Sequence, residues 1–83
     1  MPTYYFHLCD GSDVLLDPEG RELERASVAG AALAEARAIV AADAGSGHID
    51  FNQHIEVRDA AGAVVHRIAF AEAVRVTPEG GGS

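Results

Sequence analysis

TYYFHLC at residues 3–9 and HIEVRD at residues 54–59 are the two stretches that decide the fold. In both, apolar and polar side chains alternate, which is the pattern of a strand with one buried face. The buried faces are expected to be Tyr4, Phe6 and Leu8 in the first stretch, and Ile55 and Val57 in the second. We predict that these two strands lie at the centre of one sheet.

Each central strand is predicted to continue into a hairpin. The first turn, DGSD at residues 10–13, leads to a return strand at residues 14–16, and the second, DAAG at residues 59–62, leads to one at residues 64–70. Asp and Gly favour turns because Asp bonds to nearby backbone and Gly tolerates positive φ. A further turn, DPEG at residues 17–20, has Asp, Pro and Gly where a type I turn prefers them.

A long helix is predicted between the two hairpins, at residues 26–44. The stretch is rich in alanine, the best helix former, and contains no proline. Apolar side chains recur at three- and four-residue steps and form one stripe for the core. The opposite face carries the small residues Gly30, Ala34 and Ala38. This face is either a close helix–helix contact or a solvent-exposed alanine surface, and Gly45 is expected to end the helix.

The predicted element order is β-β-α-β-β, an α+β fold. If the second hairpin docks beside the first strand, the strand order is 2-1-3-4 and every neighbouring pair is antiparallel. One helix then covers one face of the sheet, which gives a two-layer sandwich. Residues 1–76 are expected to form this single domain, and residues 77–83 (TPEGGGS) a flexible Gly-rich tail. The predicted core consists of Tyr4, Phe6, Leu8, Leu33, Ala36, Val40, Ile55, Val57 and Ile68.

The 83-residue chain is acidic, with six Lys and Arg against thirteen Asp and Glu and a formal net charge of -7. This charge repels phosphate backbones and anionic lipid headgroups, so we expect no nucleic-acid partner and no membrane partner. An acidic decoy that occupies a nucleic-acid-binding protein is a second alternative function, resting on this charge alone. Cys9 is the one cysteine, and with no secretory segment it predicts a cytoplasmic protein.

His7, Cys9 and His54 are weak candidates for metal ligands. His7 and Cys9 share one strand face, and His54 is expected across from them. A zinc site needs three or four ligands that converge tetrahedrally, and the sequence has no CxxC, no HExxH and no close His-x-His pair. We therefore predict no metal, no cofactor and no enzymatic activity. A ligand- or metal-binding domain that uses the open sheet face is the first alternative.

A homodimer is the expected assembly, because a domain of 83 residues has a thin core and a two-layer sandwich leaves one sheet face open. That face is expected to present Tyr5, His7, Glu56 and Arg58. Pairing through it is favoured over pairing through the small-residue helix face, because helix propensity alone explains surface alanines. We thus predict a non-enzymatic interaction or regulatory module whose partner is itself or an unidentified protein.

The opening M-P-T-Y-Y-F-H-L, followed by Asp10-Gly11 and by D-x-E-G at residues 17–20, resembles the start of a known family. The alanine-rich helix and I-E-V-x-D-x-x-G at residues 55–62 extend the resemblance across residues 1–76. The family is an uncharacterised domain of unknown function found in small alphaproteobacterial proteins. The resemblance implies a small bacterial protein and carries no established activity.

Overall fold

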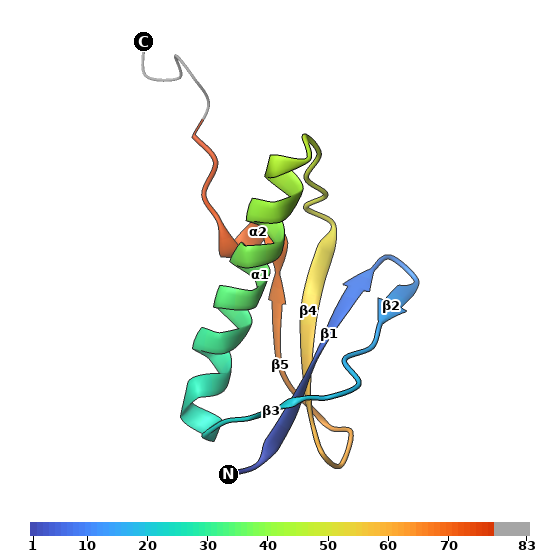
Figure 1. Cartoon of the computed structure of the whole chain (residues 1–83), viewed down its shortest axis with the longest axis vertical. Helices are drawn as coiled ribbons and strands as arrows, with labels where there is room; N and C mark the ends of the chain where they lie inside the picture. The colour runs from blue at the N-terminus through green and yellow to red at the C-terminus, as the bar shows by residue number, and fades with distance from the viewer. Residues whose placement is uncertain (78–83) are drawn as a thin grey trace.

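The computed structural model of the chain describes residues 1–77 and has two layers, a sheet and a helix on one of its faces (Figure 1). The predicted tail therefore lies outside the described residues except for Thr77. The elements in chain order are β1 (Thr3–Asp10), β2 (Asp13–Leu15), β3 (Arg21–Glu22), a 3₁₀ turn (Arg25–Ser27), α1 (Val28–Gly45), β4 (Gln53–Asp59), β5 (Val64–Ala69) and α2 (Phe70–Ala73). The α+β fold predicted from the sequence is confirmed.

The sheet is antiparallel and has the order β2-β1-β4-β5, which is the order predicted for the four expected strands. A fifth strand, β3, was not predicted. It pairs with the first residues of β1, while β2 pairs with the last ones. Its two residues, Arg21 and Glu22, are both exposed and show no alternation, so no strand pattern was present to find.

The register of the central pair places polar side chains opposite one another. Tyr5 lies across from Arg58, His7 across from Glu56, and Cys9 across from His54. Alternate residues of a strand point to opposite faces, so these six side chains share the face away from α1. This juxtaposition agrees with the sequence prediction.

The core lies between α1 and the other face of the sheet, and its buried members are Tyr4, Phe6, Val28, Ala32, Ala36, Val40, Ile55, Val57, Phe70 and Ala73. Three predicted core residues, Leu8, Leu33 and Ile68, are only partly buried. Ile68 lies on an edge strand, and Leu33 lies on the flank of the helical stripe.

Phe70 departs from the prediction, because it begins α2 instead of ending a strand. The Glu72 carboxylate accepts a hydrogen bond of 3.0 Å from the backbone N–H of Ala69, which turns the chain into a helix at this point. Phe70 is thereby rotated into the core, where its side chain is completely buried.

Helix α1 begins two residues later than predicted, and no side chain caps its first turn. The helix ends at Gly45 as predicted, but the left-handed conformation expected of that glycine is wrong. Ser46 remains helical, and Gly47 takes the positive φ of 92°. Gly30, Ala34 and Ala38 are all exposed, which leaves both interpretations of their face open. Within residues 1–77, no helix is long and apolar enough to cross a membrane.

Truncation of Phe70 tests the part of the core that the sequence missed. We expect Phe70→Ala to lower the free energy of unfolding by about 3–5 kcal/mol, because a buried ring is replaced by a cavity. Phe51→Ala is the matched control, since that ring is 36% exposed and its loss should cost much less. Urea unfolding of both variants measures the difference, and equal losses would contradict the packing described.

Candidate functional site

Asp17 and His7 tie the loop between β2 and β3 to the middle of β1. The Oδ2 atom of Asp17 accepts a hydrogen bond of 3.1 Å from the backbone N–H of Phe6. The backbone N–H of Asp17 donates to Nδ1 of His7 at 3.0 Å. Neither β2 nor β3 pairs with this part of β1, so side chains replace the missing strand–strand bonds.

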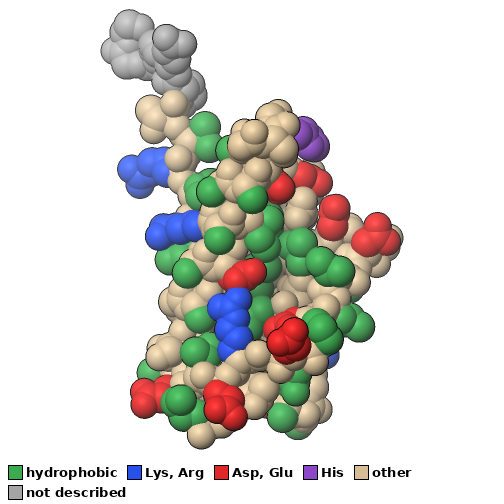
Figure 2. Space-filling model, viewed as in Figure 1, with side chains coloured by type: hydrophobic (Ala, Val, Ile, Leu, Met, Phe, Trp, Pro, Cys, Tyr) green, Lys and Arg blue, Asp and Glu red, His purple; other side chains and the backbone are tan. Residues whose placement is uncertain are grey.

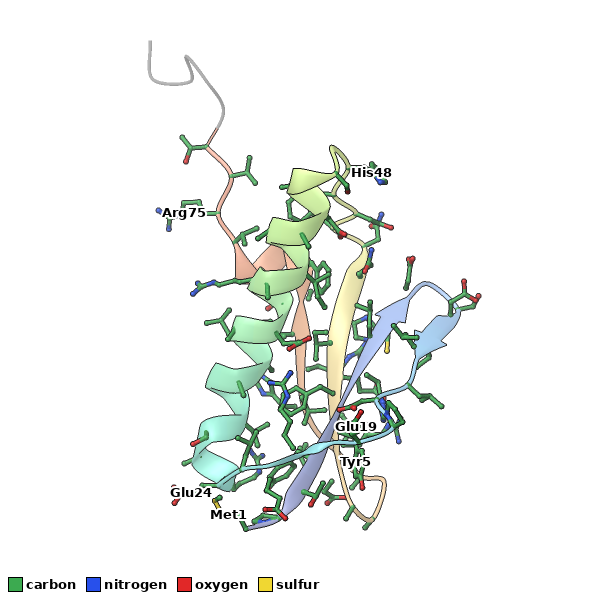
Figure 3. The ribbon with its side chains drawn as sticks, viewed as in Figure 1. Met1, Tyr5, Glu19, Glu24, His48 and Arg75 are labelled. Carbon is green, nitrogen blue, oxygen red and sulfur yellow. The ribbon has the colours of Figure 1, made fainter. Side chains whose placement is uncertain are left out.

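The turn at residues 17–20 is closed by hydrogen bonds from its own backbone to the Asp17 side chain. Oδ1 of Asp17 accepts hydrogen bonds from the N–H groups of Glu19 at 3.2 Å and Gly20 at 3.1 Å. Gly20 has a φ of +73°, and a Cβ there would lie 2.8 Å from Cγ2 of Thr3 and 2.9 Å from Cε2 of Tyr5. Figure 3 labels Glu19, the residue before Gly20, and Tyr5 at this junction. Only glycine fits where the loop meets β1.

The Asp17 carboxylate is held in its charged form. Burial raises its pKa, but the backbone N–H groups of Phe6, Gly20 and Glu19, together with the nearby Arg21, outweigh burial and leave the pKa below its usual value. Both oxygens are therefore occupied in holding the backbone. We call this arrangement of His7, Asp17 and Gly20 the latch, and it is structural.

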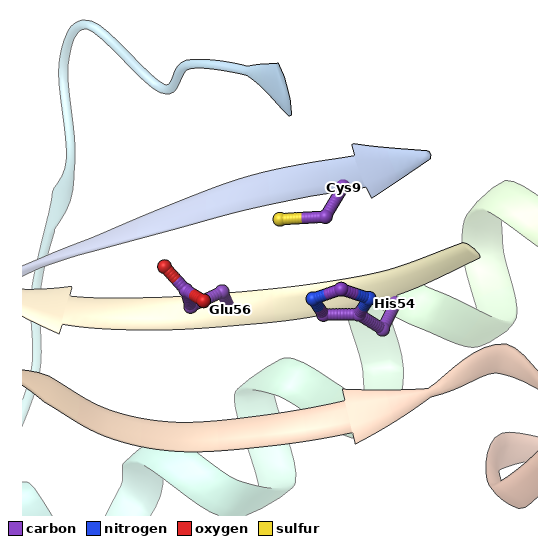
Figure 4. A group of neighbouring side chains, drawn as sticks. All are labelled: Cys9, His54 and Glu56. Atoms are coloured by element: carbon purple, nitrogen blue, oxygen red, sulfur yellow. The ribbon is translucent and has the colours of Figure 1, made fainter. Parts of the chain in front are cut away.

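Cys9, His54 and Glu56 converge on the open face of the sheet (Figure 4). The Cys9 sulfur, one imidazole nitrogen and one carboxylate oxygen lie within 4.8 Å of one another. Cys9 comes from β1 and the other two residues from β4, and α1 lies behind the strands that carry them. We call these three residues the Cys9 cluster.

Two arginines border the Cys9 cluster. Arg58 forms an ion pair of 2.7 Å with Oε1 of Glu56 and donates from its other NH group to the carbonyl of Gly62 at 2.7 Å. Arg67 lies 3.0 Å from Nε2 of His54. Arginine has no acceptor, so Arg67 must donate, and Nε2 of His54 carries the ring's lone pair.

The Cys9 thiol is protonated at neutral pH. Burial raises its pKa, the Glu56 carboxylate raises it further, and Arg67 and Arg58 act in the opposite direction. Because the thiolate is the nucleophile, a thiol with a raised pKa is poorly suited to covalent catalysis.

A groove with apolar and polar walls lies on the other side of the sheet, between α1 and the β2 hairpin. It has a volume of about 350 Å³ and a mixed lining. The apolar part is Phe6, Leu8, Leu15, Leu16, Ile39 and Ile55, and the polar part is Asp17, Glu19, Gly20, Arg21 and Glu35. Leu15 and Leu16 are 69% and 66% exposed. Figure 2 views this side and shows hydrophobic side chains gathered between the helix and the hairpin. We call it the α1–β2 groove.

The groove exists because α1 packs over β4 and β5 and leaves the β1–β2 side of the sheet uncovered. Arg21 lies between α1 and the uncovered β1–β2 side of the sheet. Its guanidinium pairs with Glu35 of α1 and lies 4.7 Å from the centroid of the Phe6 ring. A cation over an aromatic face is a favourable contact, so Arg21 covers the ring without closing the groove.

A family model described as a domain of unknown function, DUF6894, matches residues 3–71. The chain belongs to the DUF6894 family. No curated protein and no solved structure matches it. The three turns and both hairpins of the DUF6894 domain lie inside the matched residues, so the match includes the latch, the Cys9 cluster and the groove.

Sequence reasoning found part of the Cys9 cluster of this DUF6894 protein. It named Cys9 and His54 as weak metal candidates, and the structure brings them together. His7 is instead held by the latch and is not in the cluster. Glu56 takes its place, although it was predicted as an interface residue. Its position two residues after His54, on the same strand face, was the available signal.

The matched pair Gly20→Ala and Gly62→Ala tests the latch. Both glycines have positive φ, which costs another residue about 1–2 kcal/mol. A Cβ at Gly62 meets nothing within 4 Å, whereas one at Gly20 meets β1. We expect Gly20→Ala to destabilise the domain clearly more than Gly62→Ala in urea unfolding. Equal losses would mean that the close approach to β1 is unimportant.

The charged state of Asp17 predicts a pH dependence. Because folding lowers this pKa, the carboxylate contributes stability above the ordinary aspartate pKa of about 3.9, and the contribution is lost as the pH falls through the lower folded pKa. The free energy of unfolding should therefore decline less steeply with acid in Asp17→Asn than in the wild type. Asp13→Asn, on the exposed hairpin, is the control and should retain the wild-type slope.

Proposed function

We propose that this DUF6894 protein is a non-enzymatic interaction module that forms a homodimer through the α1–β2 groove. The observation that carries the proposal is the exposure of Leu15 and Leu16 beside a groove that α1 leaves open and that Phe6, Leu8, Ile39 and Ile55 line on its apolar side. Large apolar side chains clustered on one surface mark an interaction site more often than scattered ones do. The raised pKa of the Cys9 thiol supports the non-enzymatic character.

A second copy of the chain suits this surface. A two-fold interface uses the same patch on both subunits and must therefore fit itself. Such a patch needs projecting side chains and, beside them, a groove that accepts the same side chains of the other subunit. Here the projecting side chains, Leu15 and Leu16, lie next to the groove that could receive them. The leucines of each copy would enter the groove of the other.

The sequence offered two other dimer interfaces, the open sheet face and the small-residue helix face, and the side chains on both are less suited to pairing. The open sheet face presents Tyr5, His7, Glu56 and Arg58 as predicted, and Arg67 is exposed there too. Glu56 and Arg58 pair with each other, but Arg67 has no ion-pair partner among residues 1–77, and burying an unpaired charge is costly. The small-residue helix face offers little apolar area. The groove therefore replaces the sheet face as our proposed interface.

The chain's charge of -7 opposes pairing, because two acidic copies repel each other. Salt screens this repulsion, so the proposed dimer should tighten as ionic strength rises. The same charge supports our expectation of no nucleic-acid or membrane partner. The single cysteine supports a reducing, cytoplasmic setting, and the opening motif supports a bacterial origin among alphaproteobacteria.

We also propose that the opening Y-Y-F-H-L and the D-x-E-G motif are the structural signature of the family. Three of these motif residues form the latch, and their roles depend on their residue types. The side chains of His7 and Asp17 accept hydrogen bonds, and Gly20 has no side chain to collide with β1. These motif residues would then identify the fold and not a reaction.

Sedimentation equilibrium of the untagged protein across a dilution series tests the dimer, with Leu16→Glu as the decisive variant. Leu16 is exposed, so the substitution should leave the fold intact while placing a carboxylate in the interface. We expect a monomer at concentrations where the wild type is dimeric. Wild-type protein that stays monomeric at high concentration and high salt would overturn the proposal.

Three controls identify the interface. Val64→Glu tests an exposed apolar residue on the far edge strand, Arg67→Glu tests the open sheet face, and Ala34→Glu tests the small helix face. All three should remain dimeric. Dissociation by Arg67→Glu or Ala34→Glu, with Leu16→Glu unaffected, would move the interface to that face and contradict the groove.

A further inference from the structure

We infer that Cys9, His54 and Glu56 form a binding site for a zinc ion on the face of the sheet away from α1. The inference is independent of the proposed dimer, since the α1–β2 groove lies on the opposite face. It rests on the convergence of three side chains of different chemistry from two hydrogen-bonded strands. Cys9 and His54 are direct cross-strand partners, and Glu56 is two residues along β4.

The separations suit one small cation. In a tetrahedral zinc site with bonds of about 2.0–2.3 Å, neighbouring ligand atoms are about 3.3–3.6 Å apart. The three ligand atoms of the Cys9 cluster lie within 4.8 Å of one another without an ion. Side-chain movements on the order of 1 Å close that difference, and His54 and Glu56 are only half-buried and can make them.

The donor set selects the class of metal. A thiolate and an imidazole favour zinc over magnesium or calcium, which prefer oxygen ligands alone. Binding displaces the thiol proton to solvent, as happens whenever a cysteine becomes a metal ligand. Three protein ligands leave a fourth tetrahedral position for water.

The arginines define how the site responds to an ion. Arg58 holds Oε1 of Glu56 and leaves the second carboxylate oxygen without a bond to it. A hydrogen bond that orients a ligand in this way strengthens many metal sites. Arg67 instead donates to the lone pair of His54 that the ion needs, and its charge opposes a cation. Arg67 is exposed and its side chain can move away, so it competes with the ion for His54 but does not block the site.

Titration of the untagged, reduced protein with Co²⁺, followed by displacement with Zn²⁺, tests the site. The wild type should show a thiolate-to-cobalt charge-transfer band and the visible spectrum of tetrahedral cobalt, both lost on adding Zn²⁺. Losing an orienting partner costs about 10–100-fold in affinity, so losing a ligand in His54→Ala or Glu56→Gln should cost at least that much. Cys9→Ser should abolish the charge-transfer band.

Two matched pairs separate the site from adventitious binding. His48→Ala removes a histidine in the loop between α1 and β4, outside the Cys9 cluster, and should leave the affinity unchanged (Figure 3). Arg67→Gln should tighten binding, whereas Arg75→Gln, which removes the same charge beyond α2, should not. A missing charge-transfer band in the wild type, or equal losses in His48→Ala and His54→Ala, would overturn the inference. Far-UV circular dichroism without metal confirms that each variant is folded.

Discussion

The antiparallel pairing of β1 with β4 is the constraint on which the rest of the structure depends. It joins residues 3–10 to residues 53–59, on either side of α1, and its register runs unbroken from Tyr4 with Asp59 to Asp10 with Gln53. Side chains alternate between the two faces, so this one register assigns every residue of both strands to a face. A slip of one residue would expose Phe6 and Ile55 and bury the charges. The hairpin partners, the latch and the Cys9 cluster all take their positions from this pair.

Coverage of the sheet by a single helix explains the second main feature. Helix α1 packs over β4 and β5, and Arg37 secures it by donating to the carbonyl of Ala73 at 2.7 Å. One helix is about 10 Å wide and cannot also cover β1 and β2. The apolar residues on that side, Leu15 and Leu16 above all, are left exposed. Exposed apolar side chains lower the solubility of so small a domain unless a partner covers them. This is the physical basis of the proposed dimer.

The two faces of the sheet thus carry different chemistry. The helix-side face is apolar and suited to another protein surface, whereas the open face carries a thiol, an imidazole, a carboxylate and two guanidinium groups within reach of one another. The latch contacts residues of both faces. Asp17 bonds to the backbone of Phe6, whose side chain is in the core, and to the ring of His7, which is on the open face. The role of the latch is to hold the hairpin that supplies one wall of the groove.

The sequence by itself determined the long helix, four of the five strands and their order, the α+β class, and the face that Tyr5, His7 and Cys9 share with residues of the other central strand. Local periodicity and turn chemistry carry that information. The tertiary structure alone decided the rest. It determined which half of the sheet α1 covers, which depends on volumes packed across the core, and it turned Phe70 into α2. It also replaced His7 by Glu56 in the Cys9 cluster, because a hydrogen bond from a loop ten residues away engages the ring of His7. Such contacts join residues that no local pattern relates, so they emerge only when the chain is folded.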